Sequence, residues 1–413
     1  MRRKKALVVT VGTGTRADTN IVPPLVKTIE DSNPDFVVFV CTEESEKNTR
    51  EIVRNLGIKE NEDFKIFKLR TVDDLEKCFT DIADAFRFLT KREYENGEID
   101  IDFTSGTKAM TSALVLAGLA HDCGKIKYIS GERRNGVVIG GTERFYSFVP
   151  NRLKAYERLN LAKRLIYELR FDTARDLLEG IDEKILDDFN KEKKKALFQI
   201  SVAYGHWDRF MHKKARGEIE KANIQKFHDL RTFALSKETK NLLVKIGGDI
   251  EKEGPTWEIM VDIYCNARRR FDEGKYDDAL ARIYRLTEML AQWVLLNEYG
   301  IETSDVDLKK VPDTLHPLLE NNRNNEGKVQ TGLMKDYEIL NALEDKLGKT
   351  FQKNNSFQKL LKKRNRTILA HGFFPVKEGE AGDAFKYFEE FALLKNPGFK
   401  ELCRKLTFPW RKP

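Results

Sequence analysis

The side chains best suited to chemistry lie near the end of the chain, where residues 364–372 read RNRTILAHG. RNA can be cleaved without a metal when the ribose 2′-OH attacks the adjacent phosphate, a reaction that needs charge stabilisation, positioning and proton transfer. We assign His371 to proton transfer or to a hydrogen bond with the scissile phosphate. An arginine would stabilise the phosphate charge, and Asn365 would orient the helix end or the substrate.

Two arginines compete for the phosphate role in this segment. Arg364 stands seven residues before His371 and Arg366 stands five before it. On an unbroken helix positions i and i+7 share a face, so Arg364 is favoured, with Arg366 kept as a candidate. We expect a helix over 357–369 that leads into the motif. A simpler alternative is that arginine and histidine cap the end of this helix.

A glycine-rich loop near the start of the chain can hold a phosphate. The apolar run 6–11 leads into a loop that contains Gly12, Thr13, Gly14 and Thr15. The segment fits the G-x-G-x-x-A form of the dinucleotide fingerprint, with Glu43 or Glu44 where a ribose-binding acid would lie. Taken alone, it is compatible with a nicotinamide-dependent enzyme, or with glycines that only form a tight turn.

A second loop of the same kind follows the expected fourth strand. After Asp102, which we expect to support the loop, come Thr104, Ser105, Gly106, Thr107 and Lys108. Small residues at a helix start expose backbone N–H groups, and a lysine adds a cation, which makes an anion cradle. The order of residues is not that of a Walker A loop. Two cradles at the carboxyl ends of parallel strands share a crevice, and this favours an oligonucleotide over one small cofactor.

The elements around these loops alternate between strand and helix over residues 1–150. Short, continuous, β-branched runs predict buried parallel strands, and helical spacing separates them. A doubly wound α/β domain follows from this alternation. The expected strands are 6–11, 35–41, 63–69, 99–104 and 125–130, the expected helices are 21–32, 71–89 and 107–121, and 136–140 with 145–149 are expected to form a closing hairpin.

The remainder of the chain is expected to be all α-helical. We divide it into a connecting domain, 151–258, and a last domain, 259–413. Leucines and an alanine between 161 and 178 are expected to line two antiparallel helices. The segment 262–297 predicts a second helical pair with a turn at Gly274, and the polar insert 321–327 predicts a surface loop.

Composition sets limits on the class of protein. The chain has 413 residues, 34% of them charged, and a formal net charge of +7, which is compatible with a polyanionic partner. The five cysteines form no C-x-x-C pair, so free thiols in a reducing, cytoplasmic setting are expected, with no metal site. No apolar run approaches the length of a membrane span.

The motifs, taken together and in order, resemble a known family. The loops at 11–15 and 102–108 are similar to the two signature loops of CARF domains, the CRISPR-associated Rossmann-like sensors, and 131–136 with 141–144 resemble the hairpin region of that family. The stretch 276–285 followed by Glu288 resembles an early helix of HEPN domains. The segment from Arg364 to His371 matches their R-x(4–6)-H signature. A polar residue usually follows the arginine in that family, which also favours Arg364 because Asn365 follows it.

The resemblance implies a CARF–HEPN ribonuclease of type III CRISPR systems. The implied fold is an α/β Rossmann-like N-terminal domain followed by an all-α helical region and an α-helical HEPN domain. The implied activity is metal-independent cleavage of single-stranded RNA by a homodimer whose composite site takes one Arg/His set from each chain. No cofactor is implied; the activator is a cyclic oligoadenylate, with cyclic tetra-adenylate favoured over hexa-adenylate. The glycine and threonine loop residues, with Ser105 and Lys108, would bind it.

Two other interpretations stay open. The chain could be a cyclic-oligoadenylate sensor or ring nuclease whose catalysis lies in the CARF pocket, with a non-catalytic helical domain. Lys108 and Ser105 would then matter for ligand turnover, and His371 would not. A nicotinamide-dependent enzyme would offer no role for Arg364 and His371.

Overall fold

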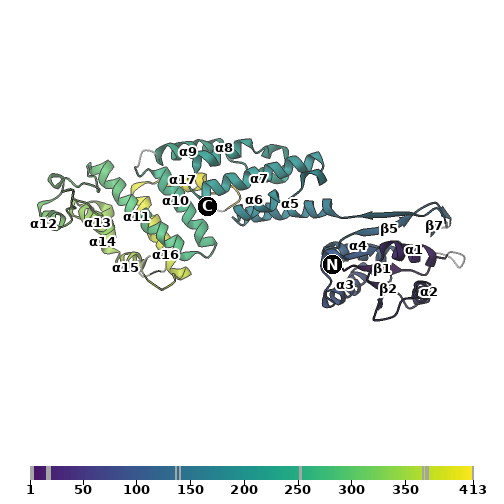
Figure 1. Ribbon diagram of the computed structural model, residues 1–413. Helices are drawn as coiled ribbons and strands as arrows, with labels where there is room; N and C mark the ends of the chain where they lie inside the picture. Colours follow the sequence, from purple (N-terminus) through teal and green to yellow (C-terminus); the bar gives the residue numbers. More distant parts are fainter. Residues whose placement is uncertain are drawn as a thin grey trace. The chain divides into compact units, whose positions relative to one another are not determined.

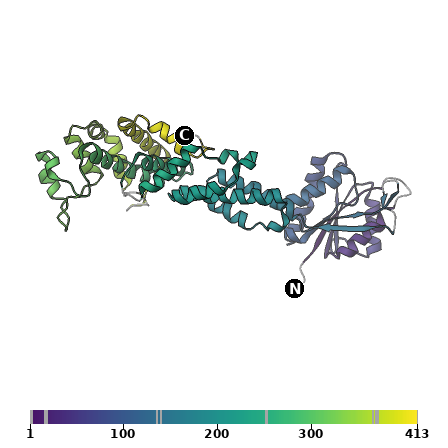
Figure 2. The ribbon, with the colours of Figure 1, turned by 90° about the horizontal axis from the view of Figure 1, so that it is seen from above.

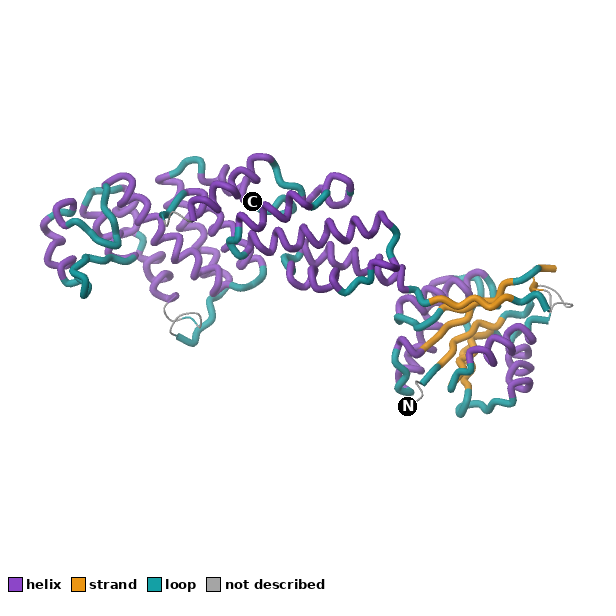
Figure 3. Tube along the Cα trace, turned by 45° about the horizontal axis from the view of Figure 1, so that its top comes forward, coloured by secondary structure: helices purple, strands orange, loops and turns teal. Residues whose placement is uncertain are grey.

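The structure is a computed structural model that describes residues 4–14, 20–134, 137–138, 141–250, 254–364, 367 and 372–411. The chain divides into two compact units, Met1–Tyr156 and Glu157–Pro413, and each is described by itself (Figure 1). Strands are drawn in the first unit and helices fill the second (Figure 3). An α/β domain followed by a helical region confirms the predicted fold class.

A six-stranded sheet forms the centre of the first unit. Its order is β3-β2-β1-β4-β5-β8, parallel except for β8, which runs antiparallel to β5. The strands at its centre are continuous apolar runs that are buried on both faces, as β1 and β2 show. The bounds are β1 (Ala6–Val11), β2 (Phe36–Cys41), β3 (Phe64–Lys68), β4 (Ile99–Asp102), β5 (Ile126–Ser130) and β8 (Arg144–Phe148).

Helices cover the two faces of this sheet (Figure 2). Because successive side chains of a strand point to opposite faces, β1 sends Ala6 and Val8 into the core beneath α3 and α4, and Leu7 and Val9 into the core beneath α1 and α2. The helices are α1 (Val22–Ser32), α2 (Glu46–Leu56), α3 (Leu75–Lys91) and α4 (Lys108–Ala120), with a short 3-10 turn, η1 (Asn96–Glu98).

Two features of the first unit differ from the sequence prediction. The closing hairpin is wrong: β7 (Val137–Val138) pairs with β6 (Arg133–Arg134), and β8 pairs with β5 instead. The prediction also missed α2, which lies between the second and third strands. Its sequence is largely polar and only Thr49 and Ile52 are buried, so few apolar residues mark it in the sequence.

The second unit is built from helices, and the unit boundary falls inside the first of them, α5. The α-helices are α5 (Asn151–Tyr167), α6 (Phe171–Glu179), α7 (Asp188–Asp208), α8 (His212–Lys221), α9 (Lys237–Asp249), α10 (Trp257–Asp272), α11 (Tyr276–Tyr299), α12 (His316–Glu320), α13 (Leu333–Ala342), α14 (Lys346–Lys353), α15 (Asn355–Arg364), α16 (Glu378–Lys395) and α17 (Phe399–Leu406). Short 3-10 turns are η2 (Glu183–Ile185), η3 (Ile224–Lys226), η4 (His228–Phe233), η6 (Leu308–Lys310) and η7 (Asp313–Leu315).

The helical pairs predicted for this unit are largely present. The α10–α11 pair with a turn at Gly274, whose φ is +73°, confirms the second predicted pair. The first pair exists as α5 and α6, but the predicted buried face of α5 is wrong. Leu161 is exposed, and the helix buries Ala162 and Ile166 instead. The predicted leucine face therefore lies beside the face of the helix that is buried.

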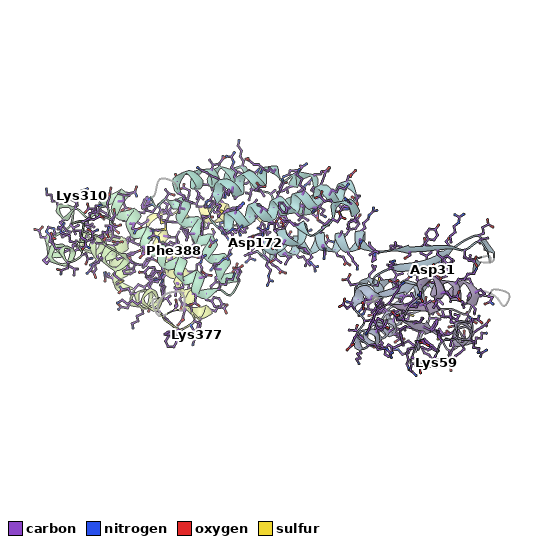
Figure 4. All side chains as sticks on the ribbon, viewed as in Figure 1. Asp31, Lys59, Asp172, Lys310, Lys377 and Phe388 are labelled. Atoms are coloured by element: carbon purple, nitrogen blue, oxygen red, sulfur yellow. The ribbon has the colours of Figure 1, made fainter. Side chains whose placement is uncertain are left out.

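Large aromatic side chains hold the helices of the second unit together. Phe388 of α16, labelled in Figure 4, is fully buried and lies 5.9 Å from the ring of Tyr264 on α10. Phe408, in the tail after α17, packs edge-on against Tyr204 and Trp207 of α7. Such pairs stabilise beyond the apolar area that they bury, so the tail is fastened to the helices by its aromatic residues.

All five cysteines are free and buried. Among the described helices, none combines the length and apolar character that a membrane span requires. The division of the helical region at residue 258 stays a prediction.

Candidate functional site

The loops that follow β1 and β4 lie directly against each other at the carboxyl edge of the sheet. The backbone N–H of Gly12 donates to the Ser105 hydroxyl at 3.1 Å. A Cβ placed on Gly12 would lie 3.0 Å from the backbone N and Cα of Gly106, which itself has a φ of +131°. Both glycines are therefore required: Gly12 by the close approach of the loops, and Gly106 by its backbone conformation.

The first loop is also held from the side of β2. The Ser45 hydroxyl donates to the Val11 carbonyl at 2.8 Å, and the Asn48 side-chain amide donates to the Gly12 carbonyl at 2.9 Å. Ser45 also accepts a hydrogen bond from the Thr42 backbone N–H at 2.9 Å. These hydrogen bonds satisfy both carbonyl groups and fix the path of the loop along the crevice.

The second loop is organised by hydrogen bonds to its own strand and to its neighbour. Asp102 is fully buried and accepts from the Thr104 backbone N–H at 2.8 Å, which is the supporting role predicted for it. The Thr104 hydroxyl accepts from the backbone N–H of Ile129 on β5 at 2.9 Å. Burial raises the pKa of Asp102, and the hydrogen bonds to Thr104 and the charge of Lys127 lower it in part.

Thr107 begins the helix that follows this loop. It is the N-cap of α4, where its hydroxyl accepts from the Met110 backbone N–H at 3.3 Å. The same hydroxyl donates to the Val72 carbonyl at 2.6 Å, which ties the loop to the segment before α3. The N-terminal N–H groups of α4 consequently point toward the crevice, where they favour an anion.

The two loops enclose a cavity of about 340 Å³. Seven of the nine predicted ligand residues line it, namely Gly12, Thr13, Gly14, Thr104, Ser105, Gly106 and Thr107. Lys108 is exposed at the start of α4 and does not line the cavity, and Thr15 lies outside the described residues.

Several cavity residues were missed by the sequence prediction. One wall is apolar and comes from the start of α1, from α4 and from β5, through Ile21, Leu25, Met110 and Ile129. Met110 both packs in the core and lines the cavity. Glu44, noted as a possible ribose-binding acid, also lines the cavity. An apolar wall beside backbone donors and a carboxylate suits a nucleotide, because base, phosphate and ribose each find a matching surface.

The C-terminal motif lies at the end of α15. Arg364 is its last residue, and the Arg364 guanidinium lies over the ring of Tyr284 on α11, 5.0 Å from its centre. Burial raises the pKa of Tyr284, and the neighbouring Glu288 raises it further. The site is thus built on α11, the helix that carries the HEPN-like sequence. Asn365, Arg366 and His371 lie outside the described residues.

The predicted helix over 357–369 is wrong in its last turn. Thr367 donates to the Arg364 carbonyl through both its backbone N–H, at 3.1 Å, and its hydroxyl, at 2.9 Å. Its own carbonyl accepts from the Gly372 N–H at 3.0 Å, and Thr367 forms an isolated bridge with Phe374. Since α15 ends at Arg364, helical spacing no longer distinguishes Arg364 from Arg366.

A buried acid near the motif was also missed. Asp336 of α13 is fully buried, and burial raises its pKa to about 7, with the neighbouring Glu288 raising it and the Thr331 hydroxyl lowering it. The sequence did indicate that this aspartate is buried. Asp336 stands between Leu333 and Leu340 at helical spacing, on the apolar face of α13.

Within the described ranges, no three or more His, Cys, Asp or Glu side chains are grouped so that they could hold a metal ion.

Comparison with known proteins finds a family match for the C-terminal part of the chain. Residues 251–394 match the family model of the Csm6 HEPN domain, a family of nucleases. This segment runs from just before α10 to the last turn of α16 and contains the whole Arg364–His371 motif. No curated protein sequence matches the chain.

The chain also matches two solved structures at low sequence identity. One is Enterococcus italicus Csm6 bound to cyclic hexa-2′-fluoro-hexa-dAMP, with 14% identity, a TM-score of 0.48, and coverage of 97% of this chain and 98% of that one. The other is Can2 from Sulfobacillus thermosulfidooxidans in complex with cyclic tetra-adenylate, with 9% identity, a TM-score of 0.23, and coverage of 51% and 67%. The match over 251–394 and the α/β domain before it show that this chain joins a Rossmann-like domain to a domain that matches the Csm6 HEPN family.

Proposed function

We propose that this protein is a cyclic-oligoadenylate-activated, metal-independent endoribonuclease that cleaves single-stranded RNA in type III CRISPR antiviral defence. The observation that carries the proposal is the HEPN match, because it spans the segment that the sequence singled out for RNA cleavage. The ribose 2′-OH attacks the adjacent phosphate, the bond to the 5′-oxygen of the next nucleotide breaks, and a cyclic phosphate forms. The arginine stabilises charge on the scissile phosphate, and His371 takes part in transferring the proton from the 2′-OH to the leaving 5′-oxygen. Asn365 orients the helix end or the substrate.

The cavity of the first unit supports a cyclic oligoadenylate as the activator. Backbone N–H groups of both loops and the start of α4 suit its phosphates, and the apolar wall suits an adenine. Of the two rings, we favour cyclic tetra-adenylate over hexa-adenylate. A ring of even symmetry suits a site formed by two identical copies.

A homodimer is the assembly that this mechanism needs, because each chain has one Arg/His motif. The edge of the sheet in the first unit supports a homodimer. β8 is the last strand of the sheet, and its Phe145 and Phe148 are 46% and 47% exposed, as is Leu116 of α4, at 46%. Exposed apolar side chains at an open strand edge are typical of an interface. Activation is then a coupling in which the ligand favours the dimer state that aligns both motifs.

The test is cleavage of a fluorescently labelled single-stranded RNA in EDTA, with and without cyclic tetra- and hexa-adenylate. We expect cleavage only with one ring, and its loss in His371→Ala. Parallel Arg364→Ala and Arg366→Ala variants decide which arginine acts. Binding of a ring without any RNA cleavage would instead favour a sensor or ring nuclease, and loss of ring turnover in Ser105→Ala would then support that alternative.

A further inference from the structure

A second cavity lies within the helical unit, and the described residues of the Arg364–His371 motif do not line it. It is enclosed by α10, α16, α17 and the tail after α17, and its volume is about 750 Å³. This volume lies within the roughly 300–1,000 Å³ range that is typical of small-molecule sites. Neither the HEPN match nor the proposed mechanism gives it a role.

The walls of this cavity carry an excess of positive charge. Five cationic side chains line it against two acidic ones, Asp272 and Glu389. Both acids already have partners inside the cavity: Glu389 accepts a hydrogen bond from the Tyr264 hydroxyl, and Asp272 pairs with Arg411. The remaining cations are therefore not neutralised by the cavity itself.

Arg269 is the most informative of these cations because it is buried. Only 4% of it is exposed, its Nε donates to Asp208 at 2.8 Å, and its guanidinium lies 4.1 Å from the centre of the Phe408 ring. Its Nη2 is buried and has no hydrogen-bond partner among the described residues. Buried donors in native proteins are almost always satisfied, so this group is suited to an acceptor that enters the cavity.

Three further cations lie at the exposed side of the cavity. Arg268 on α10 lies over the ring of Phe385, and no carboxylate among the described residues pairs with it. On α17, Lys400 has no ion-pair partner within the described ranges, and Arg404 pairs with Glu401 at 3.1 Å. Positions 400 and 404 are i and i+4, so both side chains project from one face of the helix.

We propose that this cavity binds a phosphate of the single-stranded RNA substrate, as a site separate from the Arg/His motif. Guanidinium groups match phosphate geometry with two parallel hydrogen bonds, and Arg269 still has a free donor. Trp410, half-buried in the cavity wall, gives a base a surface on which to stack. The choice of RNA as ligand rests on the proposed function, and the site holds the strand while cleavage occurs elsewhere.

The test is binding of a fluorescent 12-nucleotide strand with 2′-O-methyl riboses, which cannot undergo the proposed attack, followed by anisotropy over a series of salt concentrations. We expect the double variant Lys400→Glu/Arg404→Glu to bind about tenfold or more weakly. The slope of its salt dependence should fall by roughly 0.7 for each phosphate that the variant no longer neutralises. Arg268→Gln, on the opposite wall, should also weaken binding and lower the slope.

The matched control is Lys309→Glu/Lys346→Glu, which makes the same change of net charge at exposed lysines that do not line the cavity. An equally large weakening in this control would overturn the proposal, since it would show a response to net charge alone. Inorganic phosphate and 5′-AMP serve as competitors: displacement by either at the strand's own concentration would overturn RNA as the ligand. Because no cleavage or activator is involved, the result is independent of whether the protein is a ribonuclease.

Discussion

At the scale of residues, the first unit depends on two glycines that cannot be replaced without moving a loop. A Cβ on Gly12 would meet the backbone of Gly106 at 3.0 Å, a distance at which one loop must shift. The backbone donors of both loops face the same cavity, so their spacing decides whether one ligand can reach both. Small changes where the loops touch therefore act on binding more than on folding.

Gly12→Ala is expected to weaken binding of the cyclic oligoadenylate by about tenfold or more, because the added Cβ would push the first loop away from Gly106 and separate the backbone donors that bind one ligand. Titration calorimetry with both rings measures this. Gly97→Ala is the control, since a Cβ there meets nothing within 4 Å. Unchanged affinity in Gly12→Ala would show that the two loops do not bind the ligand together.

Asp336 is the second residue whose surroundings matter, because its pKa of about 7 lies far above that of an unfolded aspartate. The native state holds the proton more tightly, so the free energy of unfolding contributed by this group falls as pH rises toward 7. Asp336→Asn removes that dependence. From pH 5 to pH 8, its stability relative to wild type should rise by about 3 kcal/mol.

Urea unfolding at several pH values measures the effect. Asp188→Asn serves as control, because it makes the same substitution at a side chain that is 96% exposed. A constant difference between Asp336→Asn and wild type across this range would show that Asp336 titrates as an ordinary carboxyl.

At the scale of elements, α4 matters most, because its first turn forms one side of the cavity. Thr107 both caps the helix and ties the loop to the Val72 carbonyl. The hydroxyl thus couples the position of the helix start to the segment before α3. A cap of this kind contributes about 1 kcal/mol to stability.

Thr107→Ala should lower the free energy of unfolding by about 1 kcal/mol or slightly more, whereas Thr107→Ser should retain most of it. Thr111→Ala is the matched control on the same helix, since its hydroxyl bonds only to carbonyls of α4 and of its cap. Chemical denaturation of the three variants checks this. Equal effects at 107 and 111 would argue against a special role for the cap.

At the scale of the whole molecule, the proposed mechanism requires two chains. Each chain contributes one Arg/His motif, so the proposed nuclease site is incomplete in a monomer. The exposed edge strand β8 is the part of the first unit best suited to meet a second copy, because its whole length is exposed and largely apolar.

Phe145→Lys/Phe148→Lys should convert the dimer to a monomer of 47.8 kDa and abolish ligand-stimulated RNA cleavage. Light scattering after size-exclusion chromatography gives the mass. Val244→Lys, a charge placed on an exposed apolar residue of α9, is the control and should stay dimeric. A wild-type protein that is monomeric and still cleaves RNA would contradict the composite site.

The sequence by itself determined the doubly wound domain, the helical remainder and the two loops, because strand runs, helical periodicity and glycine-rich turns are local signals. Only the tertiary structure decided which side chains meet across elements. It assigned β8 to β5 and brought Ile21 and Leu25 of the first helix into the cavity. It ended α15 at Arg364 and buried Asp336 and Arg269. These interactions join residues distant in the chain, and their energies depend on packing that no local pattern contains.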